Sequence, residues 1–517
     1  MLFNSYSFIL LFLPICLVGY YLVLFLARET KYMPLLPKLW LTLMSLWFYG
    51  AFGINYLFWF VLDILLGYLI VKCMRIYGEK RKLVLVLGLL VHVGALLYFK
   101  YTGLFVSTIN AIAGTDIVLA DIILPLGISF FTFGQISYLV DTYRYLDFIA
   151  KTDSEGAEFI PSKLVYEIND SFLDYVLFVT FFPKLLQGPI ASYRYMKEQF
   201  DKIPSVRLSS EALMRGFILF TIGLFKKAIL ADTIGAGVDY GFENLVSLTN
   251  LDALITILGY TLQLYFDFSG YCDMGRGVCS MMGLDLPDNF YLPYQARNIE
   301  ETWKKWHITL TAFFTRYLYI PMGGNRVGVG RMYLNLMIVF LVSGLWHGAG
   351  WNFVVWGFTQ VALYLIYRLI NGGKKKEAGK ASLLAPLYIL LNHLYWAFSF
   401  TFFRAESVSQ ALDMFGRVIQ PFSGFHITYA LADSFYLDEI WYVIKVTPLA
   451  KWTYAGYLCM WIVLAVSCLI IWGARKSAYE IAKTIELNKP LAILTGLIFV
   501  WGVLSLSGVS TYIYLSF

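Results

Sequence analysis

The residue that most directly suggests chemistry is His347, one of only five histidines in the chain. It lies in residues 343–351 (SGLWHGAGW), within a run from 332 to 367 that has no acidic, lysine or arginine side chain. An ionisable group in such an apolar segment is a functional candidate by default. Desolvation favours the neutral imidazole, which can take a proton from a hydroxyl as its oxygen attacks an ester or thioester. The alternative is a core histidine bonded to a carbonyl group, and this segment alone does not separate the two.

A second candidate is His307, which follows the residues WKKW at 303–306. Trp303 and His307 are spaced i, i+4, so on a helix they would share a face. Residues 297–331 hold six basic and two acidic side chains, and this excess of +4 is most of the net charge of +6. Such a segment could receive an anion such as a nucleotide phosphate. The side chains expected to contact that ligand are Trp303, Lys304, Lys305, Trp306 and Arg316. An interfacial element, anchored by aromatic residues and lipid phosphates, is the favoured alternative.

Other ionisable residues carry weaker signals. Asp267 and Asp273 flank an expected glycine-rich turn (DFSGYCD). They are candidate substrate-binding residues that could orient a histidine or cap a helix, and capping or loop chemistry is the favoured interpretation. His92 and His393 each lie alone in an apolar span, which predicts structural roles, and His426 lies in a polar loop. The chain has no G-x-S-x-G, Walker or H-E-x-x-H motif, and its six cysteines form no C-x-x-C pair. Serine-hydrolase, ATPase and metalloprotease activities therefore have no support, and we expect no metal site and no disulfide framework.

The elements that must position these residues are membrane helices. Of the 517 residues, 59% are hydrophobic and only 14% are charged, with a mean hydropathy of +0.66. Soluble domains contain roughly 25% charged residues, so the composition predicts an all-α polytopic membrane protein. Its positive charge is typical of cytoplasmic loops and does not indicate nucleic acid. The expected spans are 1–27, 39–62 continued by 64–71, 83–99, 122–140, 171–182, 213–225, 253–266, 381–403, 453–474 and 490–517. Residues 142–170 and 422–451 are expected to lie outside the membrane.

The run 332–367 cannot be a single membrane helix. At 1.5 Å per residue it would be about 54 Å long, against a hydrocarbon core of about 30 Å. It must therefore break, and Gly344, Gly348 and Gly350 mark the place, with His347 among them. Broken backbone at membrane depth is tolerated only inside the protein or beside a wet cavity.

Loop charges predict the orientation. Residues 28–38 and 72–82 are basic, whereas the turn at 50–55 has no charge. Basic loops stay in the cytoplasm, which places the N-terminus outside and the basic stretches at 368–380, including Lys374–Lys376, and at 475–483 inside. The simpler interpretation is that these charges are orientation signals and have no further function.

With these residues in view, the chain resembles the membrane-bound O-acyltransferase (MBOAT) family, in particular its bacterial alginate O-acetyltransferase-like branch, which is related to the membrane subunit of teichoic-acid D-alanylation. The likeness is carried by an ordered set of motifs over most of the chain, and any one alone would be weak. The motifs are MLFNS at 1–5, PLGISFFTF at 125–133, DTYR at 141–144, FFPKLLQGP at 181–189, DFSGYCD at 267–273, WKKWH at 303–307, YLYIPMGG at 317–324, SGLWH at 343–347 and FFRAE at 402–406.

The resemblance implies one integral membrane domain over 1–517, with a core at about 121–370 and an extracytoplasmic loop at about 404–452. It implies a ring of about 11 transmembrane helices, with re-entrant or interfacial helices, around a central tunnel. His347 corresponds to the essential histidine of the family and His307 to its second conserved one. Thr302, the pair Lys304-Lys305, and Thr315-Arg316 depart from the family pattern, which bears on contacts to the donor because lysine and arginine hold anions differently.

The activity implied is O-acetylation at the cell membrane. An acyl thioester, acetyl-CoA in the simplest case, would enter from the cytoplasm as a donor substrate with no permanently bound cofactor. His347 would be the base, and His307 would orient the donor or stabilise the oxyanion. A secreted or membrane-anchored, esterase-like serine partner would pass the group to an extracytoplasmic polysaccharide. D-alanyl transfer from a carrier protein to teichoic acid is the alternative enzyme activity. A transporter or channel, which also uses broken helices, is the alternative of another class.

Overall fold

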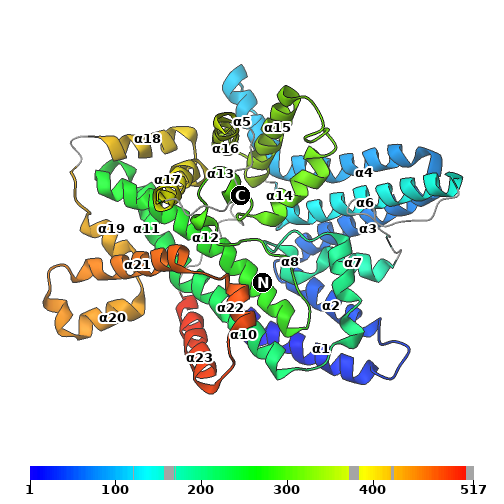
Figure 1. The fold of residues 1–517 in the computed structure, drawn as a ribbon, viewed down its shortest axis with the longest axis horizontal. Coiled ribbons are helices and arrows are strands. Elements are labelled where there is room, and N and C mark those ends of the chain that lie inside the picture. Colours follow the sequence, from blue (N-terminus) through cyan, green and yellow to red (C-terminus); the bar gives the residue numbers. More distant parts are fainter. Residues whose placement is uncertain (120–121, 156–167, 169–170, 372–382, 421–423, 508–517) are drawn as a thin grey trace. The chain divides into compact units, whose positions relative to one another are not determined.

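The computed structural model describes residues 1–119, 122–155, 168, 171–371, 383–420 and 424–507, and these are helical wherever they have regular secondary structure (Figure 1). Six helices in this part of the chain are long and apolar enough to cross a membrane: Ser7–Ala27, Ile54–Ile76, Gly78–Ala113, Val329–His347, Trp351–Ile370 and Ala455–Gly473. The prediction of an all-α membrane protein is confirmed. The expected total of about 11 spans, the ring and the tunnel stay predictions.

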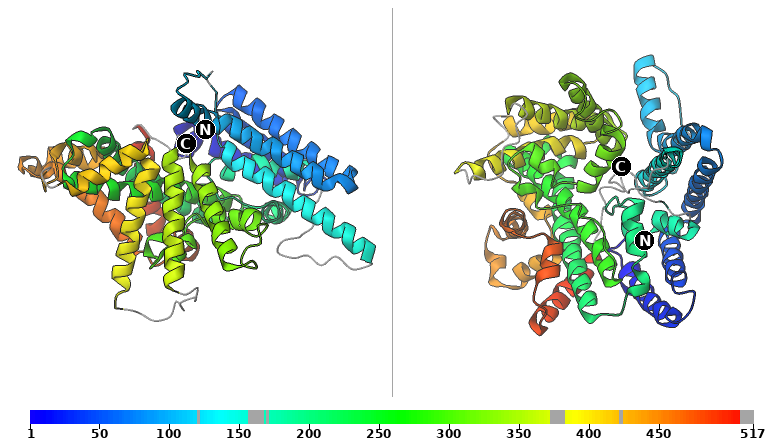
Figure 2. Two further views of the ribbon diagram at one scale, coloured as in Figure 1. Left: turned by 90° about the horizontal axis from the view of Figure 1, so that it is seen from above. Right: turned by 45° about the vertical axis from the view of Figure 1, so that its right-hand side comes forward.

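The chain divides into two compact units. The first comprises residues 1–217, 275–287 and 312–321. Its helices are α1 (Leu13–Ala27), α2 (Leu36–Gly50), α3 (Ile54–Ile76), α4 (Arg81–Leu96), α5 (Thr102–Ala113), α6 (Ile128–Glu155), α7 (Phe172–Thr180), α8 (Phe182–Leu185) and α9 (Tyr193–Phe200). Within this unit α3, α4 and α6 lie side by side (Figures 1 and 2). Helix α6 extends beyond the apolar stretch that predicted it, because residues 141–155 contain no glycine or proline to end a helix.

The second unit comprises residues 218–274, 288–311 and 322–517. Its helices are α11 (Asp232–Glu243), α13 (Ile299–Trp303), α15 (Val329–His347), α16 (Trp351–Ile370), α17 (Ala385–Arg404), α18 (Val408–Ile419), α19 (Tyr429–Ser434), α20 (Asp438–Val446), α21 (Leu458–Gly473), α22 (Ala478–Thr484) and α23 (Lys489–Leu504). Among the described residues, three helices have residues in both units: α10 (Ser210–Leu224), α12 (Asn250–Met281) and α14 (Ile308–Phe314). Lys374–Lys376 lies outside the described residues, and its cytoplasmic position stays a prediction.

The predicted break in the run 332–367 is confirmed. Helix α15 ends at His347 and α16 begins at Trp351, so the interruption is Gly348–Gly350. Gly344 is not part of the break but lies within α15, where the two helices cross. A Cβ atom at Gly344 would lie 2.4 Å from the carbonyl oxygen of Phe353, and one at Gly357 would lie 2.6 Å from that of Phe340. Glycine at these two positions therefore lets α15 and α16 pack backbone to backbone.

Candidate active site

His347 is held at the C-terminal end of α15. Its Nδ1 donates a hydrogen bond to the carbonyl oxygen of Ser343, one turn earlier, at 2.6 Å. A carbonyl can only accept, so Nδ1 carries the proton and Nε2 carries the lone pair of the neutral ring. The side chain is buried, with the rings of Trp346, Trp356 and Phe403 at centroid distances of 4.8, 5.0 and 5.2 Å. The carbonyl contact expected of a core histidine is present, and it leaves the basic nitrogen on the other side of the ring.

His307 is positioned by backbone pairing and not by a helix. The expectation that Trp303 and His307 share a helical face is wrong, because α13 ends at Trp303. The carbonyl of Lys305 accepts from the Tyr291 N–H at 2.9 Å, and the Ile308 N–H donates to the Asn289 carbonyl at 2.9 Å. These two bonds draw the chain away from the helical path. His307 lies between them with φ at +45°, a left-handed conformation that is uncommon outside glycine.

The orientation of the His307 ring is fixed by Asn289. The Asn289 Oδ1 atom accepts from the Thr309 backbone N–H at 3.3 Å and from its hydroxyl at 2.8 Å. Because the amide oxygen must face the backbone donor, the His307 Nδ1 at 3.1 Å is also a donor to it. The His307 Nε2 is buried and has no hydrogen-bond partner among the described residues. His307 therefore has the same tautomer as His347, with Nε2 as the basic atom.

The two imidazoles form one cluster. Their ring centroids are 6.3 Å apart, and the ring of Trp346 contacts both. Burial, and to a smaller extent the neighbouring His347, lowers the pKa of His307 well below its usual range. Two neutral rings with basic Nε2 atoms in a water-poor site are suited to abstracting or accepting a proton from a hydroxyl. Sequence reasoning found both histidines but missed Asn289, which carries no motif of its own.

The tryptophans beside His307 face the interior of the second unit. The Trp303 ring lies 5.2 Å from those of Phe340 and Trp396, and the Trp306 ring lies 5.1 Å from that of Phe290. Both side chains are buried, so they support the walls around the histidines instead of forming an interfacial belt.

The two adjacent lysines point elsewhere. Lys304 pairs with Glu300 at 3.0 Å and Lys305 with Glu301 at 2.8 Å, both at i, i+4 spacing. The Lys304 side chain is 66% exposed. The positive charge of this segment is therefore partly neutralised by its own two glutamates, which weakens but does not remove its attraction for an anion.

Asp267 and Asp273 do not flank a turn, because α12 runs without interruption through both of them. Asp273 pairs with Lys226 at 2.6 Å, and the buried Asp267 pairs with Lys227, which also contacts Asp232 at 2.7 Å. The expectation that these carboxylates cap a helix or lie in a loop is thus wrong, and buried lysines neutralise their charge. A role of Asp267 and Asp273 in orienting a histidine or contacting substrate stays a prediction. The glycine between them serves close packing: a Cβ at Gly270 would lie 2.7 Å from the carbonyl oxygen of Gly223.

A model of the membrane-bound O-acyltransferase family matches residues 109–376, which is more than half of the chain. The chain is also 39% identical over 422 residues to a peptidoglycan O-acetyltransferase of Helicobacter pylori, over 80% of this chain and 78% of that protein. The chain belongs to the membrane-bound O-acyltransferase family. As a member, it is an integral membrane acyltransferase, as its motifs predicted.

Two further relatives of this acyltransferase extend the comparison. A probable alginate O-acetylase of Pseudomonas aeruginosa is 34% identical over 80% of this chain and 74% of that protein. A teichoic acid D-alanyltransferase of Bacillus subtilis is 28% identical over 41% of this chain and 58% of that protein. The likeness to the two O-acetylating proteins therefore extends over about twice as much of the chain.

Arg316, the remaining expected contact of the acyltransferase, belongs to the first unit, as does Asp141. Its guanidinium pairs with the Asp141 carboxylate at 2.8 Å, and the Tyr317 hydroxyl donates to the same carboxylate at 2.7 Å. The Asp141 side chain is only 1% exposed. Arg316 therefore neutralises a buried carboxylate, which is a structural task that the sequence did not reveal because the two residues are 175 positions apart.

Proposed function

We propose that this acyltransferase moves an acetyl group from a thioester donor on the cytoplasmic side of the cell membrane toward a polysaccharide hydroxyl outside. The observation that carries the proposal is the buried pair of His347 and His307, each held through Nδ1 and each with a basic Nε2, 6.3 Å apart between ring centroids. The names of the two O-acetylating relatives support acetyl transfer to a polysaccharide. D-alanyl transfer is the weaker choice because that relative matches less of the chain.

In the proposed step, the Nε2 of His347 takes the proton of the acceptor hydroxyl while the hydroxyl oxygen bonds to the thioester carbonyl carbon. The carbon–sulfur bond then breaks, and the leaving thiolate receives the proton from the imidazolium. The ring is ready for this because the Ser343 carbonyl holds the opposite N–H and stabilises the imidazolium that forms. An acetylated hydroxyl and a free thiol result, and no oxidant or metal is needed for this balance.

His307 is assigned to orienting a reactant. Its Nδ1–H is engaged by Asn289, so in the neutral ring Nε2 can accept a hydrogen bond but cannot donate one. Stabilising an oxyanion would need a donor, and burial opposes the protonated ring that would supply it. Of its two expected roles, the geometry therefore favours holding an N–H or O–H group of the donor or acceptor.

The wider arrangement is proposed from charge and chemistry. The basic loops at 28–38 and 72–82 support a cytoplasmic position for those loops and an outside N-terminus. An acyl-CoA or carrier-bound thioester is anionic, so the exposed Lys304 supports donor entry on its side of the protein. A secreted or anchored serine-containing protein would receive the acetyl group and deliver it to the polysaccharide. A cysteine at position 375 should resist an impermeant thiol reagent in intact cells, and labelling there would reverse the topology.

The test is transfer by purified protein with radiolabelled acetyl-CoA and an alcohol or polysaccharide acceptor. His347→Asn keeps an N–H where Nδ1 donates to Ser343 but removes the basic nitrogen, and we expect a rate loss of about 100- to 10,000-fold. His426→Ala, at an exposed histidine in the same unit, is the matched control and should retain full activity. A well-folded His347→Asn protein with near-normal transfer would reject the base assignment.

A further inference from the structure

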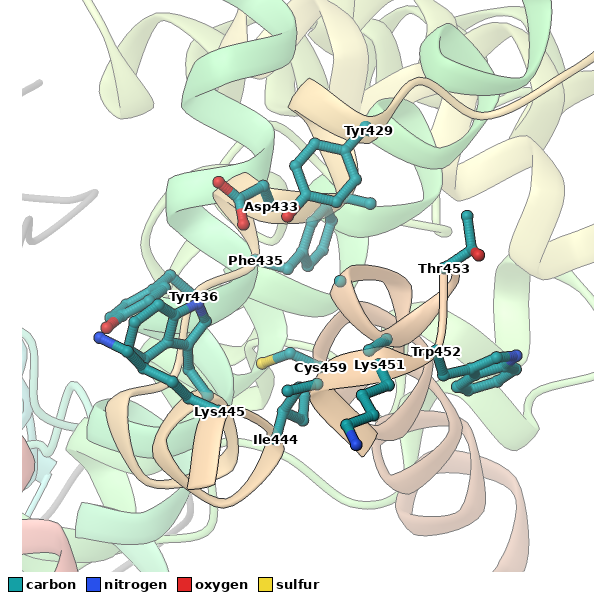
Figure 3. Close-up of a pocket in the computed structure, with 15 residues that line it drawn as sticks. Tyr429, Asp433, Phe435, Tyr436, Ile444, Lys445, Lys451, Trp452, Thr453 and Cys459 are labelled. Carbon is teal, nitrogen blue, oxygen red and sulfur yellow. The ribbon is translucent and has the colours of Figure 1, made fainter. Parts of the chain in front are cut away.

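A pocket of about 360 Å³ lies in the second unit, away from the residues of the histidine cluster. It is bordered by α19, α20, the linker from 447 to 457 and the start of α21. Figure 3 shows Tyr436 and Lys445 on one side of it, and Lys451 and Trp452 on the other. The volume is at the lower end of the roughly 300–1,000 Å³ of small-molecule sites. Most of its lining residues belong to the loop predicted at about 404–452, which places the larger part of the pocket on the extracytoplasmic side in the proposed topology.

The pocket is preformed by close packing under it. Phe435 is fully buried, and its ring occupies the space that a Cβ at Gly237 would need, with an approach of 2.2 Å. The Tyr429 ring lies equally close to Gly456, where a Cβ would be 2.3 Å from it. The Tyr457 hydroxyl also donates to the Ile427 carbonyl at 3.2 Å. These contacts hold α19 and the linker in place, so the pocket would need little further ordering when a ligand binds.

We propose that this pocket binds a segment of the acceptor polysaccharide, an inference that rests on the proposed function. The pocket offers broad aromatic faces at an open rim, where Tyr429, Tyr436 and Trp452 are 54%, 43% and 49% exposed. A sugar ring has one apolar face of C–H groups, which packs on such rings, and hydroxyls around its edge, which need polar partners. Asp433 and the tyrosine hydroxyls supply these partners.

The charges favour a sugar that carries a carboxylate. Lys445 and Lys451 both line the pocket, against one acidic residue, Asp433. Neither lysine forms an ion pair with a described residue, and the Lys445 ammonium lies 4.6 Å from the centre of the Trp441 ring. An unpaired ammonium next to an aromatic face can hold a carboxylate while the ring packs on the sugar.

A lipid headgroup is the competing occupant, since tryptophan, tyrosine and lysine also mark membrane interfaces. Interfacial residues form a belt that lies flat against the headgroups. Here the aromatic residues instead come from four different segments and enclose a concave space with polar and charged groups inside. That arrangement suits a ligand that must be contacted on several sides, so the saccharide is favoured.

The experiment measures binding of a uronic-acid oligosaccharide to the full chain in phosphatidylcholine nanodiscs, by calorimetry. The mixture contains no acyl donor, so no transfer can occur and the result is independent of the proposed function. We expect saturable binding, weaker binding of a neutral gluco-oligosaccharide, and about a tenfold loss on Trp452→Ala. Lys451→Gln should reduce the preference for the uronate several-fold. Trp461→Ala is the matched control, because Trp461 is also 49% exposed but does not line the pocket.

Each result decides between the possibilities. Absent saturable binding, or equal losses from Trp452→Ala and Trp461→Ala, would overturn the pocket assignment even if acetyl transfer is found. Displacement of the oligosaccharide by added phosphatidylglycerol, with direct phosphatidylglycerol binding that Trp452→Ala abolishes, would assign the pocket to a lipid. Binding that follows the expected order would stand even if the wild-type protein transferred no acetyl group, and only the proposed function would then fail.

Discussion

Because His307 has a left-handed backbone conformation, substitutions at this position can distinguish its structural role from its chemical role. Histidine and alanine both have a Cβ that crowds the following carbonyl at φ of +45°, but histidine is several-fold enriched in this region, so alanine is expected to cost up to about 1 kcal/mol more in backbone strain. It also removes the Nδ1–H bond to Asn289, which adds about 1 kcal/mol. His307→Ala should therefore destabilise the protein by about 1–2 kcal/mol, independently of any effect on catalysis.

His307→Asn removes only the chemistry. Asparagine tolerates the left-handed region, and its amide nitrogen has the same bonded position as Nδ1, so it can still donate to Asn289. We expect stability within about 1 kcal/mol of wild type. The variant lacks the basic Nε2, and loss of an orienting contact should lower the transfer rate about 100-fold.

The assay pairs thermal unfolding in detergent with single-turnover acetyl transfer, applied to wild type, His307→Asn, His307→Ala and His307→Gly. Glycine should regain part of the stability lost in alanine, because it has no Cβ, yet remain as inactive as asparagine. Near-normal transfer by His307→Asn would refute the role of Nε2. Equal destabilisation by asparagine and alanine would refute the account of the backbone.

Three further expectations concern pH, a buried pair and the donor. Burial lowers the pKa of His307 in the folded protein, whereas an unfolded histidine gains a proton below about pH 6.5. As the pH falls from 6.5 to 5, wild type should therefore lose thermal stability faster than His307→Asn. Parallel plots of unfolding midpoint against pH for the two proteins would contradict this. His92 Nδ1 lies 2.7 Å from the Asp63 carboxylate, so His92→Leu should lower the free energy of unfolding by up to about 3 kcal/mol. The loss should be smaller in an Asp63→Asn background, and a double-mutant cycle of unfolding midpoints would measure the difference. Lys304→Gln should raise the apparent KM for acetyl-CoA with little change in kcat. Adding Glu300→Gln restores the local net charge, so the double variant should have a KM closer to that of wild type if charge is the cause.

The features that the sequence predicted well depend on composition and length. A charge-free run longer than the bilayer is thick must break, and this argument needs no knowledge of the partners. It located the interruption after His347 to within a few residues. It misassigned Gly344, because a glycine that permits a close helix crossing and one that ends a helix look the same in a sequence.

The features that it missed depend on contacts between distant residues. The helical spacing of Trp303 and His307 was overridden by backbone bonds from the segment at 289–291, which no local pattern announces. Asn289, which decides the tautomer of His307, precedes it by 18 positions. Lys226 and Lys227 could have drawn attention, because two adjacent charges follow the apolar stretch 217–225, but their partners on α12 could not be deduced.

The basic segment shows how pairing changes the meaning of charge. Counting residues 297–331 gave +4 and suggested one anion site. In the structure Lys304 and Lys305 are opposed by Glu300 and Glu301, and Arg316 is committed to Asp141 in the first unit. A paired surface lysine can exchange its partner at little cost, whereas an arginine that neutralises a buried carboxylate cannot. The two lysines therefore remain available to a passing donor, and Arg316 does not. Substituting Arg316 should therefore change the stability of the first unit before it changes the KM of the donor.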